Sequence, residues 1–227
     1  MANDEPATAG PWVDGWLSPG RFGVYVSAVG GDRQRGLALS EWNASVSAAF
    51  QHDLAHIEVA LRNAYDTAIT AATPPGQPHW TLNASALFPV TWRTAQDGTR
   101  VDVNRTPRDQ VDRAVREAGA GAPWGKVVAE LTFGFWRYLS TAAHDYRLWI
   151  PLLHKGFIPG TTRKAVDQPV GRLHKLRNRV AHHEPLPRQN LTAQHDDILA
   201  VAGLIDAQPR DYIAGTSTCP TLIANRP

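Results

Sequence analysis

Cysteine is almost absent from this chain, with Cys219 the single one in 227 residues. One thiol cannot form an internal disulfide, and it cannot supply a cysteine-based zinc site. A chain of this length can bury a sizeable apolar core without such cross-links. The composition therefore fits one folded domain in a reducing compartment.

Long apolar runs are also missing. No stretch approaches the roughly 20 apolar residues that span a bilayer. The first residues, MANDEPATAGPW, do not show the basic region followed by an apolar run that marks a secretory signal. We therefore expect no membrane partner and a cytoplasmic location.

Acidic residues are scarce in one region, although the whole chain has a formal net charge of only +2. Between residues 163 and 188, only Asp167 and Glu184 are acidic. Seven basic residues lie in the same interval: Arg163, Lys164, Arg172, Lys175, Arg177, Arg179 and Arg188. Such a run is often a solvated helix face, and it is also the charge pattern of a surface that binds anions.

Residues 33–72 contain no proline, and Gly36 near their start is the single glycine. Apolar residues recur there at steps of three and four, as in Trp42, Val46 and Phe50, which predicts one apolar face on a long helix. Residues 73–106 instead carry prolines and glycines. Asp97-Gly98 between two short alternating runs favours a small hairpin inside this irregular insertion.

Capping residues and prolines mark the other helices. Further helix starts are expected at Ser18, Thr106, Pro123, Asp145, Thr162 and Leu191. Pro169 should kink or restart the helix that begins at Thr162, and the helix from Pro123 should present Leu131, Phe135 and Leu139 on one face. We predict an all-α bundle in which 17–208 form a single domain, 1–16 a poorly ordered tail and 209–227 a C-terminal tail.

The chemically richest segment is RNRVAHHEP, residues 177–185. Glu184 precedes Pro185 and should avoid the helical conformation, so the preceding helix should stop near His182 or His183. Arginine binds phosphate through two parallel hydrogen bonds, and histidine can move protons near neutral pH. Arg177 and His182 are about 140° apart on an ideal helix, so they converge only at an unwound end or through the reach of the long arginine.

The spacing alone is weak evidence. Arginine precedes histidine at a similar distance at three other places: Arg137/His144, Arg147/His154 and Arg188/His195. A surface cation near the negative end of a helix would also account for Arg177 and His182. A metal site is not expected, because adjacent histidines in a helix cannot easily bind one ion and the spacing matches no metal motif.

Several sequence blocks together resemble the Abi-like (abortive infection) branch of the HEPN superfamily. They are RNRVAHHEP, IEVALRNA at residues 57–64, FGFW at residues 133–136 and the region of Trp42-Asn43. The resemblance runs from about residue 18 to residue 207. It implies an α-helical bundle that dimerises, so that two motifs face one composite active site.

The resemblance also implies roles for individual residues. Arg177 and His182 match the catalytic pair of the family, and Asn178 matches the polar residue after the arginine. Possible supporting residues are Glu58, Arg62 and Asn63 of the other block, together with His183. The basic approach helix offers Arg172, Lys175 and Arg179 as RNA-binding residues. No metal and no other cofactor is expected.

The implied activity is metal-independent cleavage of RNA in antiphage abortive infection or in a toxin–antitoxin pair. The 2′-hydroxyl of RNA would attack the adjacent phosphate and give 2′,3′-cyclic phosphate and 5′-hydroxyl ends. Two alternatives stay open at this point. One is a non-catalytic RNA-binding module that holds a small antitoxin or guide RNA, and the other is an interaction scaffold that only dimerises.

Overall fold

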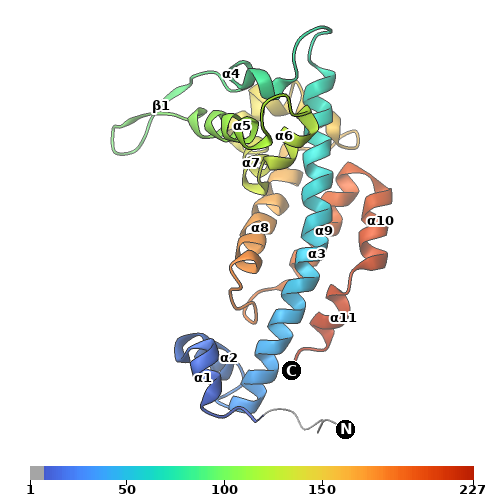
Figure 1. The fold of residues 1–227 in the computed structure, drawn as a ribbon. Helices are drawn as coiled ribbons and strands as arrows, with labels where there is room; N and C mark the ends of the chain where they lie inside the picture. Colours follow the sequence, from blue (N-terminus) through green and yellow to red (C-terminus); the bar gives the residue numbers. More distant parts are fainter. Residues whose placement is uncertain (1–7) are drawn as a thin grey trace.

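The computed structural model describes residues 8–227 and confirms the all-α prediction, with one small hairpin (Figure 1). The elements are α1 (Trp12–Leu17), α2 (Pro19–Ala28), α3 (Arg33–Ala71), the 3₁₀ turn η1 (Trp80–Asn83), α4 (Ala84–Leu87), β1 (Trp92–Thr94), β2 (Arg100–Asp102), α5 (Arg105–Ala118), α6 (Trp124–Glu130), α7 (Phe133–Leu139), the short turns η2 (Ala142–His144), η3 (Asp145–Trp149) and η4 (Leu153–Gly156), α8 (Arg163–Ala181), α9 (Leu191–Ile205), α10 (Ala207–Thr216) and α11 (Cys219–Ala224).

The long helix α3 is the scaffold of the molecule and runs along its whole length (Figure 1). It begins at Asp32, whose side chain accepts a hydrogen bond from the Arg35 amide at 3.0 Å. The apolar face predicted from the periodicity is buried, and its members include Val46, Phe50 and Leu54. With 39 residues, α3 is about 58 Å long. It therefore contacts elements at both ends of the fold.

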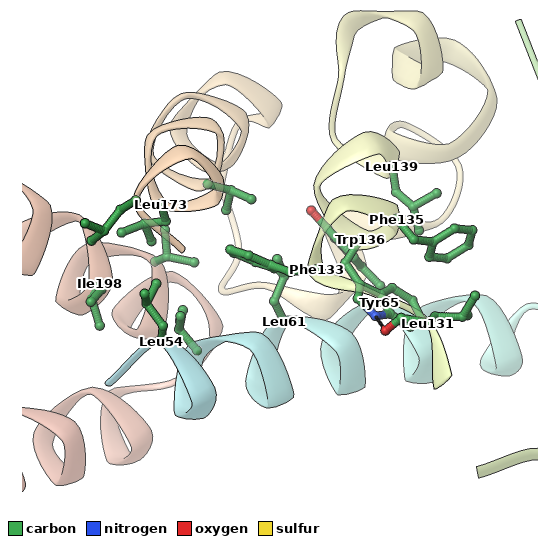
Figure 2. Packing of buried hydrophobic residues seen from close by; sticks show 14 of the residues in the cluster. Leu54, Leu61, Tyr65, Leu131, Phe133, Phe135, Trp136, Leu139, Leu173 and Ile198 are labelled. Carbon is green, nitrogen blue, oxygen red and sulfur yellow. Dashed lines mark hydrogen bonds between the residues drawn. The ribbon is translucent and has the colours of Figure 1, made fainter. Parts of the chain in front are cut away.

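The core lies where α7, α8 and α9 pack against the middle of α3 (Figure 2). Phe133 and Trp136 of the short helix α7 lie over Leu61 and Tyr65 of α3 in this view, and all four side chains are at most 1% exposed. The aromatic block FGFW is therefore a core element. It also brings the start of α7 beside the face of α3 that carries the IEVALRNA block.

Both ends of the chain are more structured than the sequence indicated. Within the expected tail 1–16, residues 1–7 lie outside the described part of the chain, whereas α1 begins at Trp12 and buries Val13 against Phe22. The expected C-terminal tail 209–227 is wrong in the same way, because α10 and α11 occupy it. They pack on α3 and α9 through the buried side chains of Ile213 and Cys219.

The insertion 73–106 contains the predicted hairpin. Strands β1 and β2 pair antiparallel, with Arg93 opposite Val101, and the loop between them has Gly98 at φ +81°. The hairpin projects from the body of the molecule (Figure 1). At its base, the Asp102 carboxylate accepts a hydrogen bond from Arg108 of α5, which fixes the hairpin to the helical part.

Three helix predictions need correction. The helix expected from Pro123 is two helices, because Leu131 and Thr132 are extended and redirect the chain so that α7 can enter the core. The helix expected from Asp145 is a wide five-residue turn, and Pro151 cannot donate the hydrogen bond needed to continue it. Of the kink or restart predicted at Pro169, the restart is absent, because α8 is continuous from Arg163 to Ala181 with Pro169 buried inside it.

His144 is a buried histidine that should make the fold sensitive to acid. It is 2% exposed, its Nε2 has no hydrogen-bond partner, and its ring meets those of Phe88 and Tyr138 edge-on. Burial, reinforced by the charges of two nearby arginines, lowers the pKa of His144 to about 4. The ordinary value is 6.5. The folded state therefore holds the neutral ring.

We expect the free energy of unfolding to fall as the pH drops from 6.5 to 4, because the unfolded chain takes up the proton more readily than the folded one. The loss attributable to His144 is at most about 3 kcal/mol. His144→Phe removes the titrating group and the unpartnered nitrogen, and urea unfolding at several pH values should show a smaller loss for this variant. If the free energy of unfolding changed with pH by the same amount in both proteins, the lowered pKa of His144 would be contradicted.

Candidate functional site

Helix α8 carries the RNRVAHHEP motif to the surface beside α3 and α7. It begins at Thr162, whose hydroxyl accepts a hydrogen bond from the Ala165 amide at 3.2 Å, and it ends with His182 as its C-cap. Leu173 and Leu176 are buried and hold the helix on the core. The stop near His182 or His183, predicted from Glu184-Pro185, is confirmed.

Glu58 of α3 lies where the two sequence blocks meet. Burial raises the pKa of its carboxyl, while the charges of Arg177 and Arg62 and the backbone amide of Phe133 act in the opposite direction. Residues of three helices thus surround the Glu58 carboxylate: Arg62 of α3, Phe133 at the start of α7, and Arg177 of α8. The structure therefore brings Glu58 and Arg62 of α3 near Arg177 of α8, which lies more than 100 residues further along the chain.

His174 belongs to the same cluster and was missed as a site residue in the sequence. Burial and the charges of Arg137 and Arg177 lower its pKa, so its ring is neutral at pH 7 and able to accept a proton. Gly134 lets α7 and α8 approach closely here, because a Cβ at this position would lie 3.2 Å from His174 Nε2 and crowd the ring. The signal in the sequence was the three-residue spacing of His174 and Arg177, which places them on one helix face.

Arg177 differs from the other arginines of α8 in what its guanidinium contacts. Arg172 makes two hydrogen bonds of 2.7 Å to Asp197, Arg179 pairs with Glu184 at 2.9 Å, and Arg163 bonds Asp167 at 3.2 Å. Within residues 8–227, half-buried Arg177 forms neither an ion pair nor a hydrogen bond through its side chain. Its donors are therefore free to bind an external anion.

The end of α8 is fixed by a Schellman motif with an unusual residue in it. The Glu184 amide bonds the Arg179 carbonyl at 2.8 Å, and the His183 amide bonds the Val180 carbonyl at 3.0 Å. His183 takes the left-handed conformation, φ +54°, that glycine normally supplies at this position. This turn leaves the His182 side chain exposed at the helix terminus.

The loop after the motif is tied down by residues from three distant segments. The Asn43 Oδ1 accepts a buried hydrogen bond of 2.7 Å from the Leu186 amide, and Arg21 of α2 donates to the His183 carbonyl. Arg226 donates to the Pro187 carbonyl at 2.8 Å. Asn43 therefore helps to set the path of the chain beyond the motif.

Other predicted site residues do not join this cluster. Asn63 is exposed and lines a separate groove with Lys155 and Pro209. Asn178 is one residue further around α8 than Arg177 and lines a shallow hollow with Lys175 and Arg179. Arg177 and His182 are not hydrogen-bonded to each other in the described part of the chain. The roles inferred for all of these residues stay predictions.

Replacement of His183 by glycine should stabilise the end of α8. Glycine adopts φ > 0 without the steric penalty of a Cβ, and we expect the free energy of unfolding to rise by about 0.5–1 kcal/mol. Ala181→Gly, two residues earlier in the last helical turn, should instead lower it by about 1 kcal/mol. Denaturant unfolding of both variants measures the difference, and a destabilised His183→Gly would show that the imidazole makes a contact of its own.

Comparisons of the chain with protein-family models, curated proteins and solved structures found no match. Among the helices of residues 8–227, none has the length and apolar character needed to cross a membrane. The same residues contain no group of three or more His, Cys, Asp or Glu side chains placed to hold a metal ion. The site therefore has to be interpreted from its own geometry.

Proposed function

We propose that this protein is a metal-independent endoribonuclease of the HEPN type, with Arg177 and His182 as its catalytic pair. The observation that carries the proposal is the half-buried Arg177 guanidinium, which has no ion-pair partner among the described residues and lies beside Glu58 and His174. A half-buried cation whose donors have no partner in the described chain is suited to bind a phosphate. The two resembling sequence blocks contribute side chains to one cluster, which supports the family assignment.

The chemistry follows from what each group can do. A neutral imidazole takes the proton of the 2′-hydroxyl, the 2′-oxygen attacks the phosphorus, and the bond from phosphorus to the 5′-oxygen breaks. A protonated group gives the departing 5′-oxygen its proton. The Arg177 guanidinium stabilises the negative charge that develops on the phosphate oxygens. The products are a 2′,3′-cyclic phosphate and a 5′-hydroxyl, and DNA is not cleaved.

Two histidines can serve this reaction. His182 is exposed at the helix end and matches the family position, whereas the neutral ring of His174 lies beside Arg177. We assign the catalytic role to His182 and propose that a second copy of the chain completes a composite site around the two motifs.

The test is incubation of the purified protein in EDTA with an RNA and a DNA of the same sequence, followed by analysis of the product ends. We expect cyclic phosphate ends from RNA alone. The single variants His182→Ala and His174→Gln show which imidazole is needed, and the double variant Arg177→Ala/His182→Ala should be inactive. Equal cleavage by wild type and the double variant would show that the site is wrongly assigned.

A non-catalytic RNA-binding module is the second candidate. It is favoured by the exposure of His182 and by the missing contact between His182 and Arg177 within the described chain. This function predicts that wild type releases no cyclic phosphate product, and that binding of RNA weakens steeply with salt because phosphate contacts displace counterions. A dimer that binds no RNA at any salt concentration would support the scaffold alternative instead.

A further inference from the structure

A groove lies next to the motif, between α2, α3 and the last turn of α8. Its volume is about 600 Å³, which is within the range of small-molecule sites. One side of the groove is lined by Trp16 and Tyr25, and another side by Asn43, Ser47 and Gln51. His183 lies at its end. The proposed catalytic residues Arg177 and His182 do not line the groove, whereas the neighbouring His183 does.

The groove lies along the same faces of α3 and α8 that carry Glu58, His174 and Arg177. Gln51 and Glu58 are seven residues apart on α3, which is nearly two full turns, so they lie on one face about 10 Å apart along the axis. On α8, Ala181 lies one turn beyond Arg177, and it lines the groove. A ligand bound at Arg177 can therefore extend directly into the groove.

A polar group in the groove lacks a partner. Ser47 is 8% exposed, and its hydroxyl has no hydrogen bond within the described residues. The oxygen is buried just behind the surface of the groove, and buried hydroxyl groups are nearly always hydrogen-bonded, so a rotation of this side chain toward a ligand would give the hydroxyl the partner it lacks. The neighbouring Asn43 uses its Oδ1 for the Leu186 amide, and its amide nitrogen donates to no described residue.

The character of the walls favours a flat, neutral ligand. Arg21, which donates to the His183 carbonyl, and Glu41 both line the groove, so its Arg and Glu side chains have opposite charges and the groove is not a concentrated cationic site for phosphate. The remaining polar groups are the neutral side chains of Asn43, Ser47 and Gln51, which can bond the edge of a base. Trp16 is 62% exposed and offers a ring on which a base can stack.

We propose that this groove receives an unpaired nucleobase of the RNA whose phosphate binds at Arg177. Stacking on Trp16 holds the base, while the stripe of Asn43, Ser47 and Gln51 reads its edge. Such recognition is typical of single-stranded RNA, whose bases are free to leave the stack. The inference rests on the proposed function, and it gives that site a means of selecting single-stranded segments.

The test is the affinity of the purified full-length protein for a short single-stranded RNA and for versions that carry one abasic nucleotide at each position. We expect one abasic position to weaken binding to wild type about tenfold, the usual scale of one stacked base. This position effect should disappear in Trp16→Ala. It should persist in Trp124→Ala, which removes an equally accessible tryptophan, 52% exposed, outside the groove.

A second variant keeps the test independent of stacking. Gln51→Leu keeps the size of the side chain and removes its hydrogen-bonding groups, and we expect it to change which base is preferred at the sensitive position. An abasic profile that is identical in wild type, Trp16→Ala and Gln51→Leu would overturn the groove assignment and leave the nuclease proposal standing. Absence of RNA binding by wild type would overturn both the groove assignment and the nuclease proposal. If Trp16→Ala instead dissociated a dimer, the groove would be assigned to a protein interface.

Discussion

Arg177→Ala is expected to reduce cleavage of RNA by at least about 100-fold while the protein stays folded. Loss of one group that stabilises developing negative charge typically has an effect of this size. The fold should tolerate the change, because the guanidinium has no ion-pair partner among the described residues. The measurement is the single-turnover cleavage rate, with circular dichroism to confirm the helical content.

Two further arginine variants sharpen this result. Arg177→Lys keeps the charge without the two-pronged geometry and should retain only part of the activity. Arg172→Ala on the same helix tests the RNA-binding role predicted for Arg172, whose guanidinium is already bound by Asp197. We expect it to change the rate only a few-fold, on the scale of a surface ion pair. A larger loss from Arg172→Ala than from Arg177→Ala would place the phosphate site on the other face of α8.

The arrangement around Arg177 has a signature that does not depend on catalysis. The charge of Arg177 lowers the pKa values of both His174 and Glu58. Its removal should therefore raise both, and a nuclear magnetic resonance titration of the His174 ring measures the first of these shifts. An unchanged His174 titration in Arg177→Ala would mean that the two side chains are not neighbours in solution.

Asn43→Ala is expected to lower the free energy of unfolding by about 2 kcal/mol. The change removes the buried acceptor of the Leu186 amide, and an amide left without a partner inside a protein costs about 1–3 kcal/mol. Asn63→Ala on the same helix removes an exposed amide, and its effect should stay within about 0.5 kcal/mol. Urea unfolding of both variants gives the comparison.

The same variant should also reduce cleavage, because the Leu186 amide fixes the chain just beyond His182 and His183. A loosened loop places the histidine less accurately, and small misplacements of a reacting group lower a rate strongly. Asn43→Ala measured well below its unfolding transition separates this effect from loss of folded protein. Full activity in that variant would show that the loop position is set elsewhere, for example by Arg21.

Local patterns were sufficient to predict the long helices, but not several of the short ones or how the helices assemble. The length of α3 followed from its apolar periodicity, and the side chains of Ser18 and Thr162 cap helices where expected. The proline at position 185 predicted the end of α8. The ends of the chain were misjudged, because α10 is stabilised by packing on α3 and α9 rather than by a strong pattern of its own.

The composition of the site was harder to predict than its location. The pairing of Arg172 with Asp197 joins residues on two helices, and no local pattern reveals it. Asn63 follows Arg62 directly in the sequence, yet it lies on another face of α3. His174 was overlooked because its importance arises from Gly134, which allows α7 to approach it closely. Such contacts depend on packing between segments that are far apart in the chain.

The tethers of the loop after α8 have a consequence for the order of folding. Asn43 and Leu186 are 143 residues apart, and the neighbouring Trp42 bonds the Leu222 carbonyl across 180 residues at 2.7 Å. Contacts of such long range form late, because the entropy of closing the intervening chain must be overcome first. We therefore expect the motif to acquire its final geometry late in folding, so that partly folded chains do not present an assembled site.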